Sequence, residues 1–259
     1  MQRTRYEDLP PDIAAAVAAN EGVVMNYLGA LGYMVMQSSR DPTYRDNDVL
    51  SYLAQDLLQS AMAVIVLPRE GMPNAAKREL RFLLEASVKL AFVQQEGPGK
   101  TVLEKLERFD KELSSSKISI KKTLALPLLP EAVREAFREE VGRLFSLTSA
   151  YVHLSPMQIQ ASIEAAEAGI TAGKERASDI EALKAITERV LAASLVLMLN
   201  SMPYWVAGDW LVGEDGRSPE WHFTRSRFIA AMDSEFDYKH ERQADLDAIQ
   251  AERQSRIAF

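Results

Sequence analysis

The sequence predicts an all-α protein, an up-and-down helical bundle with additional helices at its C-terminal end. Alanine is abundant along the 259 residues, whereas the 12 glycines and 11 prolines gather where helices should end. Apolar residues recur at three- and four-residue intervals, which is the period of an amphipathic helix. The alternating pattern of strands is scarce, so we expect helices packed on helices.

The helical period predicts seven main helices. They span residues 11–36, about 46–66, 74–96, 102–113, 131–152, 155–168 and 179–202. The first begins after Pro10 with Pro11 at its first position, where proline is favoured because the amide it lacks would have no helical partner. The second is closed by the proline-containing turn at 68–73.

The third helix begins on Asn74, a residue type that caps helices, and is stopped by Pro98 and Gly99. The short fourth helix precedes a Ser- and Lys-rich connection that reads as an exposed loop. The fifth helix has the cleanest amphipathic stripe in the chain, and the sixth begins on Ser155 followed by Pro156.

The seventh helix is strongly apolar over 190–199, but Asn200, Ser201 and Pro203 interrupt it before the roughly 20 residues needed to span a bilayer. We therefore expect a buried core helix and no membrane span. The tract 204–221 reads as a loop that its tryptophans tie to the core, and a charged final helix with a bend is expected over 219–256. The expected organisation is a bundle domain over 1–215 and a helical extension over 216–259 packed on it.

Composition excludes several kinds of chemistry. The chain has no cysteine and three histidines, so a thiolate zinc site, an iron–sulfur cluster and a cysteine nucleophile are ruled out, and we expect neither metal nor cofactor. A net charge of −7 disfavours a general nucleic-acid coat. The polar N-terminus has no apolar core of signal-peptide type, which favours the cytoplasm.

One nucleotide-binding motif fails on inspection. The segment 97–101 (GPGKT) resembles the end of a P-loop, but position 94, where the first glycine belongs, holds Gln94. The preceding segment also reads as a helix, whereas a P-loop follows a strand. A helix stop followed by a new helix is the preferred interpretation.

The third helix carries one polar stripe on a segment that is otherwise apolar. Arg81, Glu85 and Lys89 are spaced by four residues, which places them in contact, and Arg78 extends the stripe by one turn. The stripe is either a solvated ladder of ion pairs or the wall of a polar cleft.

The end of the fifth helix carries His153, the best candidate for acid–base chemistry among the three histidines. On a helical wheel it shares a face with the small residues Gly142, Ser146, Ser149 and Ala150, so a ligand or partner helix could approach the imidazole. A histidine near a helix end is also commonly a cap or a satisfied structural group.

Two stretches together resemble the core helices of HEPN-like proteins, closest to a poorly characterised bacterial branch with an Arg-rich LLEA helix and a later YxHxS segment. They are 76–86 (AKRELRFLLEA) and 147–155 (LTSAYVHLS). The resemblance implies an all-α fold, a homodimer and a bacterial stress or defence role. Many such proteins are metal-independent ribonucleases, with an arginine a few residues before the histidine. This chain has no arginine there, and Arg143 is the nearest upstream.

Two functions follow. The favoured one is a dimerising module with no or conditional activity, in which Arg81, Glu85 and His153 hold a polar network or bind a protein partner or ligand. The alternative is an RNA-cleaving enzyme that uses no metal. Its catalytic residues would be His153 as general acid or base and Arg78, Arg81 or Arg143 as the group that stabilises phosphorane charge. Binding of substrate or ligand would fall to Glu85, Lys89, Ser149 and Tyr151.

Overall fold

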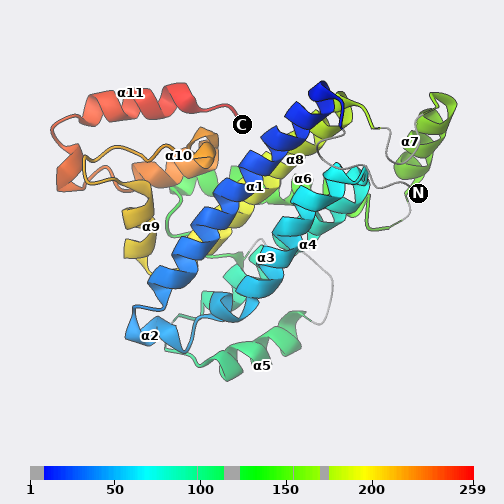
Figure 1. Ribbon diagram of the computed structural model, residues 1–259. Helices are drawn as coiled ribbons and strands as arrows, with labels where there is room; N and C mark the ends of the chain where they lie inside the picture. The colour runs from blue at the N-terminus through cyan, green and yellow to red at the C-terminus, as the bar shows by residue number, and fades with distance from the viewer. Residues whose placement is uncertain (1–8, 98, 114–122, 154, 170–174) are drawn as a thin grey trace.

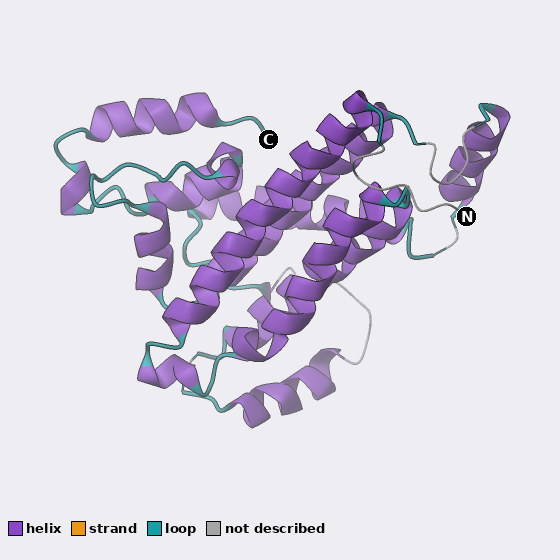
Figure 2. Cartoon of the chain, viewed as in Figure 1, coloured by secondary structure: helices purple, strands orange, loops and turns teal. Residues whose placement is uncertain are grey.

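The chain folds into a helical bundle with no strand among the residues that the computed structural model describes, which are 9–97, 99–113, 123–153, 155–169 and 175–259 (Figures 1 and 2). This confirms the predicted all-α class. The α-helices are α1 (Pro11–Ser38), α2 (Pro42–Arg45), α3 (Val49–Arg69), α4 (Pro73–Gln94), α5 (Val102–Leu113), α6 (Glu131–Ser149), α7 (Pro156–Glu167), α8 (Ala177–Leu199), α9 (Tyr204–Leu211), α10 (Arg227–Ser234) and α11 (Leu246–Arg256). Two 3₁₀ helices, η3 (His222–Arg225) and η4 (His240–Arg242), lie between the last elements.

Five long helices build the bundle. Helix α8 packs against α1 and α4, α3 packs against the same two helices, and α6 packs against α4 and α8. Figure 1 shows α7 standing apart at one end, while α9, α10 and α11 lie together beyond α1. The C-terminal elements are joined to the bundle because α10 packs against α8 and α6.

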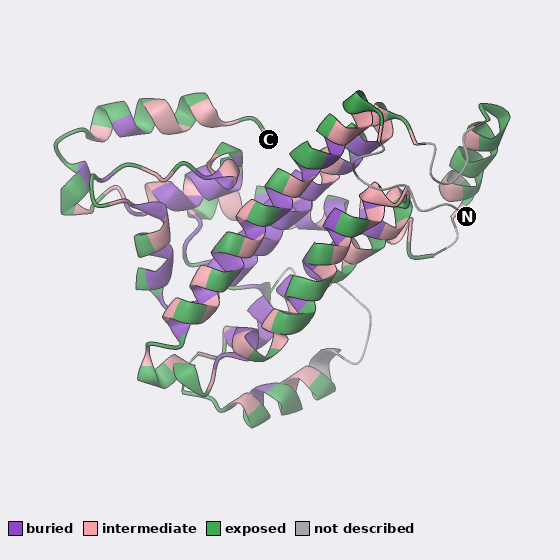
Figure 3. Ribbon diagram, in the orientation of Figure 1, coloured by how far each residue is buried: buried purple, intermediate pink, exposed green. Residues whose placement is uncertain are grey.

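Helix α8 is the core helix of the bundle. Every residue from Val190 to Leu199 is buried, as the sequence predicts for this apolar segment (Figure 3). In the described part of the chain, α3 alone is long and apolar enough to cross a membrane; its most apolar 18-residue window has a mean hydropathy of 1.5 and is 39% buried in the fold. One such helix is weak evidence for a membrane span, because core helices of globular proteins pass the same test of length and composition.

The structure differs from the prediction in the type or the bounds of three elements. The tract 204–221 was expected to be a loop but begins with α9, which follows Pro203 at its N-cap. The single helix expected over 219–256 is instead η3, α10, η4 and α11. The fifth predicted helix ends at Ser149, so Tyr151 to His153 form a turn and the helical wheel does not place His153. The connection 114–122 lies outside the described residues.

Tryptophans fasten α9 and the segment that follows it to the bundle, as predicted. The indole of Trp210 lies 4.7 Å from the ring of Tyr33, centroid to centroid, and 5.4 Å from Trp221. The indole nitrogen of Trp221 donates a hydrogen bond to the carbonyl of Asn26 at 3.1 Å. These contacts bind the region to α1, because apolar ring surface is buried and the indole nitrogen of Trp221 has a hydrogen-bond partner.

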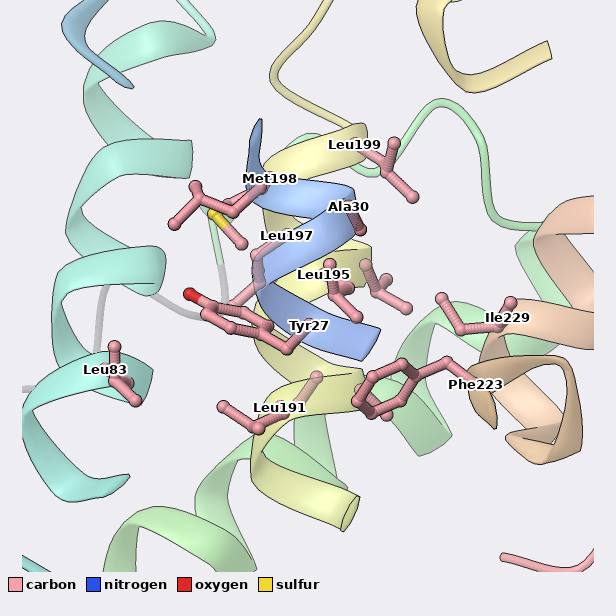
Figure 4. Packing of buried hydrophobic residues seen from close by; sticks show 14 of the residues in the cluster. Tyr27, Ala30, Leu83, Leu191, Leu195, Leu197, Met198, Leu199, Phe223 and Ile229 are labelled. Carbon is pink, nitrogen blue, oxygen red and sulfur yellow. The ribbon is translucent and has the colours of Figure 1, made fainter. Parts of the chain in front are cut away.

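Tyr27 of α1 occupies the centre of the core. Its side chain is fully buried in the same apolar cluster as Leu83 of α4 and Leu191 and Met198 of α8 (Figure 4). Burial raises the pKa of its phenol, and the hydroxyl has no hydrogen-bond partner within the described structure. A buried hydroxyl without a partner destabilises the fold because it has lost its hydrogen bonds to water.

We predict that Tyr27→Phe raises the free energy of unfolding by about 1 kcal/mol, since the change removes the unpaired hydroxyl and keeps the ring. Urea denaturation of both proteins measures the difference. The matched control is Tyr52→Phe, at a side chain 64% exposed, where no change is expected. A loss of stability in Tyr27→Phe would show that the hydroxyl has a partner.

Candidate functional site

The polar stripe of α4 is a ladder of ion pairs, as its spacing predicts. The Glu85 carboxylate contacts Nη1 of Arg81 at 2.6 Å and Nζ of Lys89 at 2.5 Å. The three side chains are only 12%, 31% and 28% exposed for Arg81, Glu85 and Lys89, respectively. The ladder is therefore half-buried against neighbouring helices. The apolar residues around the ladder are not all buried, because Phe82 is exposed.

Arg81 joins α4 to α6. Its Nε donates a hydrogen bond to Oγ of Ser149 at 2.9 Å, and its guanidinium carbon lies 3.3 Å from the centroid of the Phe145 ring. Ser149 in turn donates to the carbonyl of Phe145 at 2.6 Å. Two of the predicted site residues are thus brought together, and their contacts hold the end of α6 against α4 through hydrogen bonding and a cation–π contact.

Arg78 and Lys77 hold the turn after α6. Nε of Arg78 donates to the carbonyl oxygen of Tyr151 at 2.7 Å, and the ammonium of Lys77 lies 4.2 Å from the centroid of the Tyr151 ring. Lys77 was absent from the predicted site. Lys77 could have been found from its spacing, since it precedes Arg81 by four residues and therefore lies on the same side of α4.

His153 is exposed in this turn. Its backbone amide donates to the carbonyl of Ser149 at 3.3 Å, and its imidazole makes no hydrogen bond or ion pair to any described residue. The structure therefore places His153 two residues from Tyr151, whose carbonyl is bound by Arg78. It does not place the imidazole in a buried network with Arg81 and Glu85.

Arg143 belongs to a different cluster. It contacts Glu140 at 3.1 Å and Glu139 at 3.6 Å, both within its own helix. Glu140 is 9% exposed and is also bound by Arg189 of α8 at 2.5 Å. These ion pairs give Arg143 a structural partner, because Glu140 is a nearly buried carboxylate that needs compensating charge.

A cleft of about 700 Å³ adjoins Lys77 and Tyr151. It lies between the start of α4, α7 and the start of α8. Its charged lining residues are Lys77, Glu164, Glu175, Arg176 and Asp179. Two cations against three carboxylates do not make a basic groove, so the cleft does not attract a phosphate backbone electrostatically.

His222 has a partner that sequence reasoning did not find. Its Nε2 lies 3.0 Å from Oε1 of Glu188 in α8, and the same oxygen accepts a hydrogen bond from Lys184 at 2.5 Å. Burial lowers the pKa of His222, and the opposing effect of Glu188 does not outweigh it. The pair is 34 residues apart in the chain, so no local spacing could have indicated it.

The described residues contain no group of three or more His, Asp or Glu side chains arranged to hold a metal ion. Comparisons of the chain with protein-family models, curated proteins and solved structures give no match. The site must therefore be interpreted from its own geometry.

Glu85 gives the ladder a pH dependence. Burial opposes its ionisation, but Lys89 and Arg81 outweigh burial and hold its pKa below the ordinary value of 4.5. A carboxylate with a lowered pKa stabilises the fold above its unfolded pKa and loses that contribution as the pH falls through its folded pKa.

We predict that Glu85→Gln lowers the free energy of unfolding by about 1 kcal/mol at pH 7, since the pairs are partly exposed. Because the contribution of Glu85 disappears on acidification, the difference should shrink below pH 4.5. Thermal denaturation at several pH values measures it. Glu79→Gln, on the same helix but with no ion pair to a described residue, is the control and should change little. A difference independent of pH would contradict this assignment.

Proposed function

We propose that this protein is a non-catalytic helical module that acts by associating with another protein, first of all a second copy of itself. The observation that carries the proposal is that two of the three candidate arginines, Arg81 and Arg143, are engaged by carboxylates within the chain. Arg81 is shared between Glu85 and Ser149, and Arg143 between Glu139 and Glu140.

Phosphoryl chemistry would need at least one of these guanidinium groups to face the substrate. A donor that stabilises a phosphorane must point at the developing charge without first breaking other contacts. Arg81 would have to leave a carboxylate, a hydroxyl and an aromatic ring to do so. Its present contacts instead fix two helices against each other.

The proposed class is a HEPN-like module of bacterial stress or defence type. Its support is the pair of short motifs at 76–86 and 147–155, together with their contact through Arg81 and Ser149 in an all-α bundle. The homodimer belongs to the same proposal, since many HEPN-like proteins dimerise.

A metal-independent endoribonuclease is the second candidate, and one observation favours it. His153 is exposed, and Arg78 reaches the same turn with its Nε while its terminal nitrogens have no hydrogen-bond partner among the described residues. An exposed imidazole and a partly engaged guanidinium that reaches the same turn are the two groups that acid–base catalysis and charge stabilisation require.

An RNA cleavage assay separates the two functions. Purified full-length protein is incubated with total RNA and with a defined single strand in the presence of a chelator. The proposal expects no cleavage above background by the wild type, by His153→Ala, or by His240→Ala, which removes another exposed histidine. Cleavage by the wild type and the His240 variant, lost in the His153 variant, would establish the enzyme and overturn the proposal.

A further inference from the structure

Helix α1 carries an uncharged exposed seam with the spacing of a coiled coil. We define the seam as Ala18, Gly22, Met25, Gly29, Gly32 and Met36, all of which are exposed (Figure 3). Successive members are separated by four, three, four, three and four residues, and Pro11 and Ala15 continue the alternation toward the N-terminus. A 3.5-residue repeat of uncharged positions is the mark of a helix that packs along another helix.

The seam is not explained by packing inside the chain. The residues that pack on the core, among them Tyr27 and Leu31, lie on the opposite side of α1. A Cβ atom added to any of the three seam glycines would meet nothing within 4 Å. Glycine is the least favourable residue in a helix interior after proline, so three of them on one open face indicate close approach by something outside the chain.

We propose that the seam is the face through which two copies of this chain associate, with the two α1 helices antiparallel across a two-fold axis. This inference rests on the proposed function and names its surface. An antiparallel pair places Met25 against Gly29 of the partner subunit and Met36 against Ala18 of the partner subunit. Each large side chain then enters a space left by a small one, as helix packing requires.

The size of the surface fits a dimer when α3 is included. At 1.5 Å per residue the stretch from Pro11 to Met36 is about 38 Å long and, at helix width, supplies about half of the roughly 800 Å² per partner of a stable interface. Helix α3 packs beside α1 and exposes Leu58, Met62 and Val66, whose side chains are 43%, 40% and 46% exposed. Because α3 packs against α1, these exposed side chains add uncharged surface on the neighbouring helix.

Charge favours a second protein copy over a lipid surface. The charged residues of α1 are Asp12 and Glu21, and the helix contains no lysine or arginine. The chain as a whole carries a net charge of −7. Anionic lipid headgroups attract basic segments, and this face has no basic side chain to bind them. An uncharged seam that is complementary to itself instead suits a two-fold contact between identical surfaces.

Sedimentation velocity tests the proposal on the full chain. The wild type is expected to be a dimer, and Met25→Lys to raise the dimer dissociation constant at least tenfold, because two lysines would be buried without partners. Met25 is 53% exposed in the single chain, so the substitution should not disturb the fold of the monomer. The circular dichroism and melting temperature of the monomeric Met25→Lys variant should therefore be those of the wild-type fold. Met72→Lys, at a methionine 43% exposed in the turn before α4, is the matched control and should remain dimeric.

Cysteine cross-linking tests the register, since the natural chain has no cysteine that would interfere. Oxidation of the double variant Met25→Cys/Gly29→Cys should give covalent dimers at low protein concentration, and Ser255→Cys on exposed α11 should not. A wild-type dimer that survives Met25→Lys and does not cross-link would overturn the seam and leave the proposed association intact. A wild type that stays monomeric would overturn both, and co-sedimentation of that monomer with anionic vesicles, lost in Met25→Lys, would assign the face to lipid instead.

Discussion

Replacement of Arg242 by alanine is expected to lower the free energy of unfolding by about 3 to 5 kcal/mol. Arg242 is fully buried in η4. Removing it would leave carboxylates in the interior without their counterion, which costs more than the loss of a surface ion pair.

The contacts of Arg242 use all five of its N–H donors. Nη2 binds Oδ1 of Asp233 at 2.6 Å and the carbonyl of Leu211 at 3.3 Å, Nη1 binds Oδ1 of Asp237 and the carbonyl of Asp233, and Nε binds the carbonyl of Gly216 at 2.9 Å. A guanidinium has five such donors, so none is left without a partner. The side chain thereby connects the end of α9, the loop at 216, α10 and η4.

Arg253 of α11 completes the cluster by binding both Asp233 and Asp237. Burial raises the pKa of Asp237, but hydrogen bonds from Arg253, Gln250 and Arg242 outweigh it and hold that pKa below its ordinary value. Two arginines and two aspartates therefore form a network of balanced charge. Removal of one arginine would leave the two carboxylates with a single cation and an uncompensated negative charge.

Urea denaturation of Arg242→Ala, followed by circular dichroism, measures this expectation. Arg217→Ala is the matched control, because Arg217 lies in the same region and contacts Glu252 and Asp245 with a side chain 46% exposed. A change below 1 kcal/mol is expected there. If the two variants were equally stable, the buried network would not be a determinant of the fold.

The long elements of this fold were predictable from sequence because each has a clear apolar period. The bundle helices begin and end near prolines, glycines and caps, and the i, i+4 spacing of Arg81, Glu85 and Lys89 predicted their ion pairs. The C-terminal region was not predictable in this way. Its short helices are held by Arg242 and by indole contacts, which join residues far apart in the chain and leave no local pattern.

The candidate site likewise has features that local sequence patterns predicted and one that depends on tertiary contacts. The sequence predicted Arg78, Arg81 and Ser149 as candidate site residues, and the structure brings them to the junction of α4 and α6. It could not show that α6 stops at Ser149, because the apolar period continues to Val152 while the backbone leaves the helix. The place of His153 depended on that boundary, and helix ends are set by tertiary contacts such as the one from Arg78 to the Tyr151 carbonyl.

A second large effect is expected from Gly216→Ala, which should lower the free energy of unfolding by about 2 to 4 kcal/mol. Gly216 has a φ of +77°, a conformation that residues with a Cβ atom adopt at a cost. A Cβ atom at this position would lie 2.3 Å from the carbonyl oxygen and 2.7 Å from the carbonyl carbon of Glu241. Because these are backbone atoms, the chain next to Arg242 would have to move.

Gly97→Ala separates the cost of the positive φ from the cost of the steric clash. Gly97 also has a positive φ, +85°, but an added Cβ atom would meet nothing within 4 Å. That variant should cost about 1 to 2 kcal/mol, the price of the backbone conformation alone. Thermal denaturation of both variants gives the cost of the steric clash at Gly216 as the difference. If both variants lost the same stability, the backbone at 241–242 would move to accommodate the added Cβ atom at no measurable cost.

The double variant Gly216→Ala/Arg242→Ala should be less destabilised than the sum of its parts. The carbonyl of Gly216 accepts a hydrogen bond from Arg242, and a Cβ atom at 216 would displace the segment that carries this arginine. Part of the cost of Gly216→Ala is therefore damage to the Arg242 network, which cannot be lost twice. A double-mutant cycle should give a coupling energy of about 1 kcal/mol or more, whereas additive losses would show that the turn and the ion network stabilise the C-terminal region independently.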